Sequence, residues 1–348
     1  MAEPTLAEKK AQLEADVQAL GVTPVWVRAR EREGSGGGQP RGLGETSRPL
    51  VLPWSTLYPL LLRAGEVITM GEDAFRRAFG GYQIVMPEER AVAHRHSFSA
   101  VRFAVLGDGL GYTTSNGEQM FMEPGDFMVQ PSMCWHDHGN LGQEPVVWMD
   151  FLDIDLLLPL ETGMSEGWPN DDIQPVTHKE GFYGDLYGNV RPARLIGAQL
   201  NSIADSPPMT YKWRDTLPML ERMAADGEHN PYDGVLLEYA NPVTGGPTLP
   251  TMRARIQLLA PGEETLAHRH TGFVRYNCVQ GEGVTTLDLE DTTELEWGLR
   301  DIFRVPSWRW HRHKNLSKTE PAILFSIGYS PMAETLGLYR EEAAPAGA

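Results

Sequence analysis

The sequence contains ten histidines, and eight of them form two matching sets of four. The sets are His94, His96, His136 and His138, and then His268, His270, His311 and His313. Side chains two residues apart on a β-strand point to the same face, so each His-x-His pair would present both imidazoles to one surface. Three imidazoles from two neighbouring strands can bind one iron, zinc, copper or nickel ion and leave coordination positions open. The pattern therefore predicts a catalytic metal site.

The two histidine sets belong to an internal repeat. The segment PEERAVAHRH at 87–96 recurs without a gap as PGEETLAHRH at 261–270, and residues 126–140 reappear at 301–315 with a slip of one position. An isolated His-x-His pair is often a surface feature, but recurrence in the same relative positions argues against that alternative. Each copy consists of short β-favouring runs separated by Gly, Pro and Asp turns, which predicts two tandem antiparallel all-β barrels.

One arginine in the first copy is a candidate for substrate binding. Arg102 follows His96 in HRHSFSAVRF and has the same parity as the two histidines, so we expect it on their face of the sheet. A guanidinium beside a metal could hold a carboxylate by a fork of hydrogen bonds, although it could also balance a nearby aspartate. The matching residue in the second copy is Tyr276, so we expect catalysis in the first barrel.

Two further residues of the first copy are assigned roles near the metal. His138 lies two positions beyond His136, and we expect it to accept a proton from a substrate hydroxyl; a structural hydrogen bond is the alternative. Asp150, in the run VVWMDFLD, is expected to orient a histidine by a hydrogen bond, or else to be an ordinary carboxylate at a strand end.

The remaining sequence suggests the following organisation. Residues 1–70 would form an N-terminal helix, opened by a capping box at Thr5 and Glu8, and a flexible arm rich in Gly and Pro. Residues 71–158 would form the first, catalytic barrel and residues 236–348 the second. Residues 159–235 would be a connector with one helix near 214–226, and a short helix is expected over 332–342.

The composition and sequence patterns limit which partners and which cellular location we expect. A net charge of -17 argues against nucleic acid, because phosphate binding relies on clustered Lys and Arg. The sequence has no run of 18 apolar residues, and its start lacks the layout of a secretory signal, so we expect a soluble cytoplasmic protein that does not enter membranes. Only two cysteines occur, Cys134 and Cys278, too few for a disulfide framework or a thiolate metal cluster.

Four segments resemble the gentisate 1,2-dioxygenase family, which also contains salicylate, nitrosalicylate and 1-hydroxy-2-naphthoate dioxygenases. These segments are HRHSFSAVRF, PGDFMVQPSMCWHDHGN, YANPVTGGPTLPTMR and IFRVPSWRWHRHKN. Most cupins place a glutamate ligand soon after the His-x-His pair, whereas this family does not, and none follows His96 here. The resemblance extends over nearly the whole chain from Gly21 onward. It implies a bicupin: two tandem jelly-roll β-barrels with an N-terminal helical arm and a few short helices.

The resemblance also implies a reaction. Fe(II) would be held by His94, His96 and His136, with the substrate carboxylate and ortho hydroxyl chelating the metal and O2 taking a remaining position. The ring would open between the carbons bearing the carboxylate and the hydroxyl, which converts gentisate to maleylpyruvate. The family's partners are a small aromatic acid and O2, and its members form homo-oligomers, either tetramers or dimers.

The family's site residues transfer to several positions of this chain. Arg102, His138 and Asp150 fall where the family has residues that bind substrate or support the ligands, and Gly81 and Gln83 resemble a Gly-x-Gln stretch that lines the pocket. Arg76 matches a family arginine and would also bind substrate.

The chain departs from the family pattern at two places. The segment between Arg76 and the first His-x-His pair is shorter than usual, and Glu72 stands where some salicylate-cleaving members have arginine, which leaves the substrate open. The second barrel keeps an intact triad, His268, His270 and His311, which predicts a second metal site.

Two alternatives to gentisate cleavage remain at this point. The same chemistry could act on salicylate, 5-nitrosalicylate or 1-hydroxy-2-naphthoate, which a substrate panel would distinguish. From a different class, the chain could be a metal-binding cupin that isomerises sugars or stores a ligand. Oxygen consumption on addition of ferrous iron and gentisate separates these classes, because an isomerase or storage protein uses no oxygen.

Overall fold

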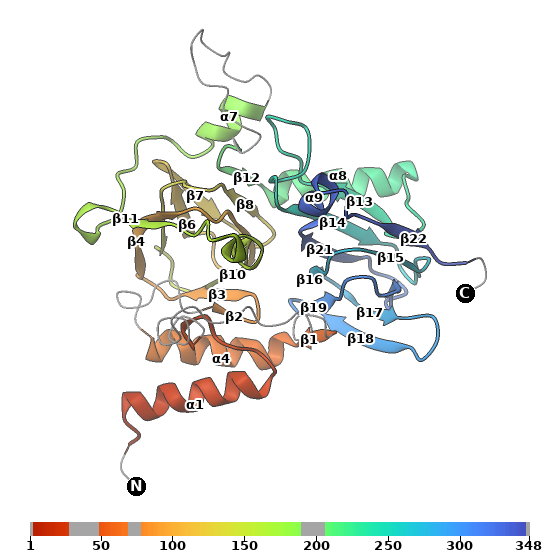
Figure 1. Ribbon diagram of the computed structural model, residues 1–348, viewed down its shortest axis with the longest axis horizontal. Helices are drawn as coiled ribbons and strands as arrows, with labels where there is room; N and C mark the ends of the chain where they lie inside the picture. The colour runs from red at the N-terminus through yellow and green to blue at the C-terminus, as the bar shows by residue number, and fades with distance from the viewer. Residues whose placement is uncertain (1–2, 28–48, 69–77, 189–205, 346–348) are drawn as a thin grey trace. The chain divides into compact units, whose positions relative to one another are not determined.

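The computed structural model describes residues 3–27, 49–68, 78–188 and 206–345, which form two compact units (Figure 1). Among the described residues, the first unit contains 3–27, 55–68, 78–188 and 207–212, and the second contains 49–54, 206 and 213–345. Each unit is built around two antiparallel β-sheets, as the repeat predicts. None of the described helices is both long and apolar enough to cross a membrane.

The N-terminal helices belong mainly to the first unit. Helix α1 (Leu6–Ala19) begins at the predicted capping box, in which the Thr5 hydroxyl accepts from the Glu8 amide and the Glu8 carboxylate accepts from the Thr5 amide. Helix α4 (Trp54–Val67) follows, and Arg63 on it forms an ion pair of 2.6 Å with Asp16 on α1. The expected flexible arm lies largely outside the described residues.

The first barrel consists of a six-stranded and a five-stranded sheet. The six-stranded sheet has the order β12 (Met209–Tyr211), β8 (Phe127–Gln130), β5 (Ala100–Leu106), β10 (Val146–Leu152), β3 (Tyr82–Val85) and β2 (Ala78–Phe79). The five-stranded sheet has the order β11 (Ser165–Gly167), β4 (Arg90–His96), β9 (His136–Asn140), β6 (Gly111–Ser115) and β7 (Glu118–Met122). Buried apolar side chains, Trp148 and Met120 among them, fill part of the interior between the sheets.

The second barrel repeats this arrangement. Its six-stranded sheet has the order β1 (Leu50–Leu52), β19 (Ile302–Val305), β16 (Val274–Gln280), β21 (Ala322–Gly328), β14 (Arg253–Leu259) and β13 (Val235–Glu238). Its five-stranded sheet has the order β18 (Thr293–Gly298), β17 (Glu282–Leu287), β20 (His311–Asn315), β15 (His268–His270) and β22 (Glu341–Ala343). Its apolar core includes Phe303, Trp297 and the ring of Tyr276.

The region expected to connect the barrels also contributes strands to them. Strand β11 pairs with β4 and β12 pairs with β8, so both extend sheets of the first barrel. The helices in or next to this region are α6 (Ile154–Leu157), η1 (Leu158–Leu160), η2 (Pro169–Asp171), α7 (Phe182–Gly188) and α8 (Trp213–Asp226). Helix α8 matches the helix expected over 214–226.

The C-terminal helix is shorter than expected. Helix α9 (Ser330–Thr335) ends just before Gly337, whose φ of 69° lies in the left-handed region that favours glycine and interrupts a helix. Residues 341–343, part of which was expected to be helical, instead form β22, which pairs with the histidine strand β15. Strand β22 therefore borders the second histidine set.

Candidate metal centre and substrate pocket

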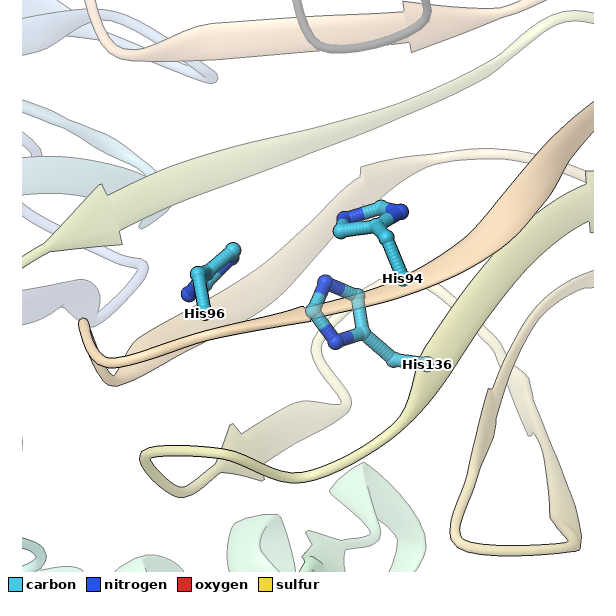
Figure 2. A group of neighbouring side chains, drawn as sticks. All are labelled: His94, His96 and His136. Carbon is cyan, nitrogen blue, oxygen red and sulfur yellow. The ribbon is translucent and has the colours of Figure 1, made fainter. Parts of the chain in front are cut away.

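The three histidines expected to bind metal in the first barrel converge. His94 and His96 lie on β4, and His136 lies opposite His94 on the adjacent strand β9. Figure 2 shows the three rings turned toward a common space from these two strands. One nitrogen of each ring lies within 4.8 Å of one nitrogen of each of the other two. Since metal–imidazole bonds are about 2.0–2.1 Å long, these rings can share one ion.

The opposite nitrogen of each ring is tethered to the backbone. The Nδ1–H groups donate to carbonyl oxygens two residues away: His94 to Val92 at 2.9 Å, His96 to Phe98 at 2.6 Å and His136 to Cys134 at 2.9 Å. A ligand histidine held in this way presents Nε2 to the metal in a defined orientation. In the described part of the chain, the buried Nε2 of His136 has no hydrogen-bond partner, which is the state that a metal ion would relieve.

Burial also sets the protonation state of these rings. It lowers the pKa of His94 to about 3 and that of His96 to about 4, and it lowers the pKa of His136 well below its usual value. The imidazoles are therefore neutral near pH 7, and their Nε2 lone pairs are available without loss of a proton. The donor set fits a divalent transition-metal ion.

Arg102 faces the same interior, but by a different route from the one expected. The parity argument treated 94, 96 and 102 as one strand, whereas the chain turns at 97–99 and β5 lies in the opposite sheet. Arg102 is only 3% exposed and lines the cavity together with His94 and His96. The histidine triad and the guanidinium therefore stand on facing sheets.

Three side chains surround the Arg102 guanidinium. Nη1 donates to the amide oxygen of Gln130, Nη2 donates to His138 Nε2 at 3.1 Å, and Nε lies 3.6 Å from Asp150 Oδ1. Asp150 stands directly opposite Arg102 in the pairing of β5 with β10. Asp150 was expected to orient a histidine, and the structure places its carboxylate beside the guanidinium.

The tautomer of His138 follows from these contacts. Arginine has only donors, so His138 Nε2 is an acceptor, and the Nδ1–H then donates to Thr113 Oγ1 at 2.9 Å. Burial lowers the pKa of His138 well below its usual value. The nitrogen that could accept a substrate proton is thus unprotonated and borders the cavity.

The cavity between the sheets encloses about 330 Å³ when it is counted out to its open mouth. Its lining residues are Gln83, Ala91, His94, His96, Arg102, His138, Asp150 and Leu152. Gly81 lies next to this site, since its carbonyl accepts a hydrogen bond of 2.8 Å from the Asp150 amide. Arg76 lies outside the described residues.

Sequence reasoning missed several residues of this pocket. Gln130 and Thr113 reach Arg102 and His138 only through strand pairing, and neither stands out in its own segment. Ala91 and Leu152 form apolar walls of the cavity. Ala91 lies three residues before His94 in the repeated segment, and strand alternation does not bring it to the histidine face. A bulge in the pairing of β4 with β9 between Ala91 and His94 changes the alternation.

Comparison with known proteins identifies the chain. The cupin domain family model matches residues 81–154 and 255–328, one match in each barrel. A 5-aminosalicylate 1,2-dioxygenase of a Comamonas species is 35% identical over 316 residues, covering 85% of this chain and 82% of the relative. A gentisate 1,2-dioxygenase of a Haloferax species is 37% identical over 269 residues, covering 75% of this chain and 73% of the relative. The chain belongs to the gentisate 1,2-dioxygenase family.

Solved structures of related proteins have the same fold as this family member. The salicylate 1,2-dioxygenase of Pseudaminobacter salicylatoxidans superposes with a TM-score of 0.74 at 28% identity, covering 92% of this chain and 97% of that one. A structure of that enzyme with gentisate gives a TM-score of 0.75 at 28% identity, covering 99% and 96%. The predicted bicupin fold and family are confirmed, and the family makes this chain a ring-cleaving oxidoreductase that uses O2.

Proposed function

We propose that the first barrel binds Fe(II) through His94, His96 and His136 and opens the ring of gentisate to give maleylpyruvate. The observation that carries this proposal is a buried guanidinium, that of Arg102, facing three convergent imidazoles across a small cavity. Iron held there would bring the aromatic acid and O2 together and pass electron density from the ring to oxygen.

Arg102 would bind the substrate carboxylate. Its guanidinium is a planar fork that matches a carboxylate, and desolvation in this buried site strengthens each hydrogen bond. A carboxylate would compete with His138 for Nη2, while Gln130 keeps its bond to Nη1 and Asp150 stays beside Nε. The guanidinium is thus held in place by the protein and still has a donor to offer.

His138 would accept the proton of the substrate hydroxyl. Its Nε2 carries the lone pair, and the bond from Nδ1–H to Thr113 keeps the ring in that tautomer. When a carboxylate draws Arg102 Nη2 away, His138 Nε2 becomes available to the hydroxyl. Carboxylate binding and proton acceptance are therefore coupled through one hydrogen bond.

Gln83 and Gly81 would support the wall of the pocket nearest Asp150. The amide oxygen of Gln83 accepts a hydrogen bond of 2.9 Å from Trp148 Nε1, which fixes the orientation of the Gln83 side chain at the edge of the cavity. The Gly81 carbonyl anchors the Asp150 backbone. Both residues would act by positioning the groups that contact substrate.

The proposal is tested by anaerobic reconstitution with Fe(II), followed by oxygen and a panel of aromatic acids. The panel contains gentisate, salicylate, 5-aminosalicylate, 5-nitrosalicylate and 1-hydroxy-2-naphthoate, since relatives carry the names of these substrates. We expect oxygen uptake and ultraviolet absorbance of a ring-opened keto acid, largest with gentisate. A larger kcat/KM for another acid would replace gentisate as substrate, and no oxygen uptake with any acid would overturn the reaction.

A further inference from the structure

The second barrel contains a histidine cluster that the proposed reaction does not use. His268 and His270 on β15 and His311 on β20 have ligand nitrogens within 4.8 Å of one another. His311 donates through Nδ1 to the Arg309 carbonyl at 3.1 Å, so its Nε2 points into the barrel. That Nε2 is buried and has no hydrogen-bond partner in the described ranges. A buried, unsatisfied imidazole nitrogen beside two others favours a metal ion.

A carboxylate from outside the repeat lies beside one histidine of this cluster. Asp233 Oδ1 lies 3.9 Å from His268 Nε2, and Asp233 Oδ2 accepts a hydrogen bond of 3.2 Å from Asn230 Nδ2. Two ligands of one ion with bonds of about 2.1 Å stand roughly 3–4 Å apart, so Asp233 and His268 are close enough to share an ion. Asp233 and His268 are 18% and 16% exposed, so the pair is partly shielded from solvent.

The second cavity differs from the first in its volume and in the charged residues that line it. It has a volume of about 540 Å³ counted out to its mouth and is lined by Asp233, His268, His270 and Tyr276 among others. Two arginines that border it, Arg253 and Arg255, both approach Glu238, at 3.1 and 3.7 Å. Those cations are therefore balanced by a carboxylate, and among the described residues of the second unit no arginine is buried as Arg102 is in the first.

We propose that the second barrel binds a divalent transition-metal ion through His268, His270, His311 and Asp233. Three neutral imidazoles and one carboxylate give the ion an anionic ligand that the three histidines of the first triad lack. The fourth protein ligand also occupies a position that a chelating substrate would need. The chain therefore carries two metal sites of different composition, and this proposal stands apart from the ring-cleavage reaction.

The test counts Co²⁺ bound to the full-length, metal-free protein. Co²⁺ replaces other divalent ions at nitrogen and oxygen sites, and its visible absorption reports the number and type of ligands. We expect two ions per chain in the unmodified protein and one in His136→Ala, which isolates the second site. We expect none in His136→Ala combined with His311→Ala. The matched control replaces His229, which is 47% exposed, by alanine in the His136→Ala background and should retain one ion.

The role of Asp233 is tested in the same background. Asp233→Asn keeps the side-chain shape but removes the charge, so we expect Co²⁺ affinity to fall on the order of 10- to 100-fold and the absorption spectrum to change. Asp291→Asn, at an exposed turn residue, is the control and should alter neither. Comparing Asp233→Asn with Asp291→Asn tests the Asp233 ligand even if the double histidine variant fails to fold. Circular dichroism would reveal such a failure.

Two results would overturn the proposal. One ion in the unmodified protein that disappears in His136→Ala would mean that the second barrel binds no metal. Equal affinity and spectra for Asp233→Asn and Asp291→Asn would remove the carboxylate from the ligand set. Because the count needs neither substrate nor oxygen, its outcome is independent of whether the first barrel cleaves gentisate.

Discussion

The two barrels share one histidine framework and differ in what faces it. In each, a threonine on a third strand bonds to the fourth histidine, between Thr113 Oγ1 and His138 Nδ1 at 2.9 Å and between Thr285 Oγ1 and His313 Nδ1 at 2.8 Å. On the opposite sheet, the paired residues Arg102 and Asp150 of the first barrel correspond to Tyr276 and Ser326 of the second.

Under the proposed function, this difference separates metal binding from substrate binding. Tyr276 stacks on Phe303 with ring centroids 4.7 Å apart, and burial raises the pKa of its hydroxyl, so this position of the second barrel is neutral. The first barrel instead keeps a buried cation. One sheet of the repeat thus carries the histidine triad in both barrels, while the side chains of the facing sheet differ.

The largest expected effect comes from breaking the triads one at a time. His96→Ala should remove iron from the first barrel and lower turnover by ~1,000-fold or more, because metal stabilisation of the reaction is worth several kcal/mol. His270→Ala should reduce second-site metal and stability, with a much smaller loss of turnover. Metal analysis and oxygen uptake check both variants. Normal iron content and turnover in His96→Ala would mean that catalysis was assigned to the wrong barrel.

The next effect concerns the facing sheet. Arg102→Ala should leave iron bound but lower kcat/KM roughly 10- to 100-fold, since a hydrogen bond to a charged group contributes about 1.5–3 kcal/mol. Tyr276→Phe, at the corresponding position, should leave turnover within about two-fold. Steady-state kinetics with gentisate measures this contrast. An unchanged KM and kcat in Arg102→Ala would remove the carboxylate-binding role.

Lowering the pH should reduce the stability of the two metal-free barrels to the same extent. Burial lowers the pKa of His96 and of His270 to about 4, so both rings stay neutral in the folded state at pH 5–6 while the unfolded chain takes up protons below about 6.5. The unfolded state then binds more protons, and stability falls as pH drops, by about 1.4 kcal/mol per pH unit for each such histidine. Urea unfolding between pH 6 and 5 should give a shallower slope in His96→Gln and, equally, in His270→Gln. Unequal changes in this slope would show that His96 and His270 are not equally buried.

The smallest effect concerns the shared histidine–threonine bond. Thr113→Val leaves the His138 Nδ1–H group without its acceptor, and Thr285→Val removes the hydroxyl that bonds to His313 Nδ1 and accepts from Trp297 Nε1. Each change should cost about 1–3 kcal/mol in unfolding free energy. Only Thr113→Val should also lower kcat, by about three- to ten-fold, because His138 contacts Arg102 in the barrel proposed to be catalytic. Thermal unfolding and kinetics on the two variants check this. Equal losses of kcat would indicate a general effect of destabilisation.

The local sequence pattern alone was sufficient to predict the strands and the histidine triads of this protein. Alternation along a strand brings His94 and His96 to one face, and the repeat at 261–270 identifies a second copy, so the all-β architecture and both triads could be predicted from the sequence. The capping box at Thr5 was predictable for the same reason, since its partners lie three residues apart.

Tertiary structure decided which side chains face the triads. Arg102 reaches the first triad from the opposite sheet, Gln130 meets it through the pairing of β5 with β8, and Asp233 approaches His268 from 35 residues away in the chain. Such neighbours depend on strand register and on how two sheets close, which bring together residues distant in sequence. Spacing between histidines therefore located the two triads, whereas only the folded barrels determined their surroundings.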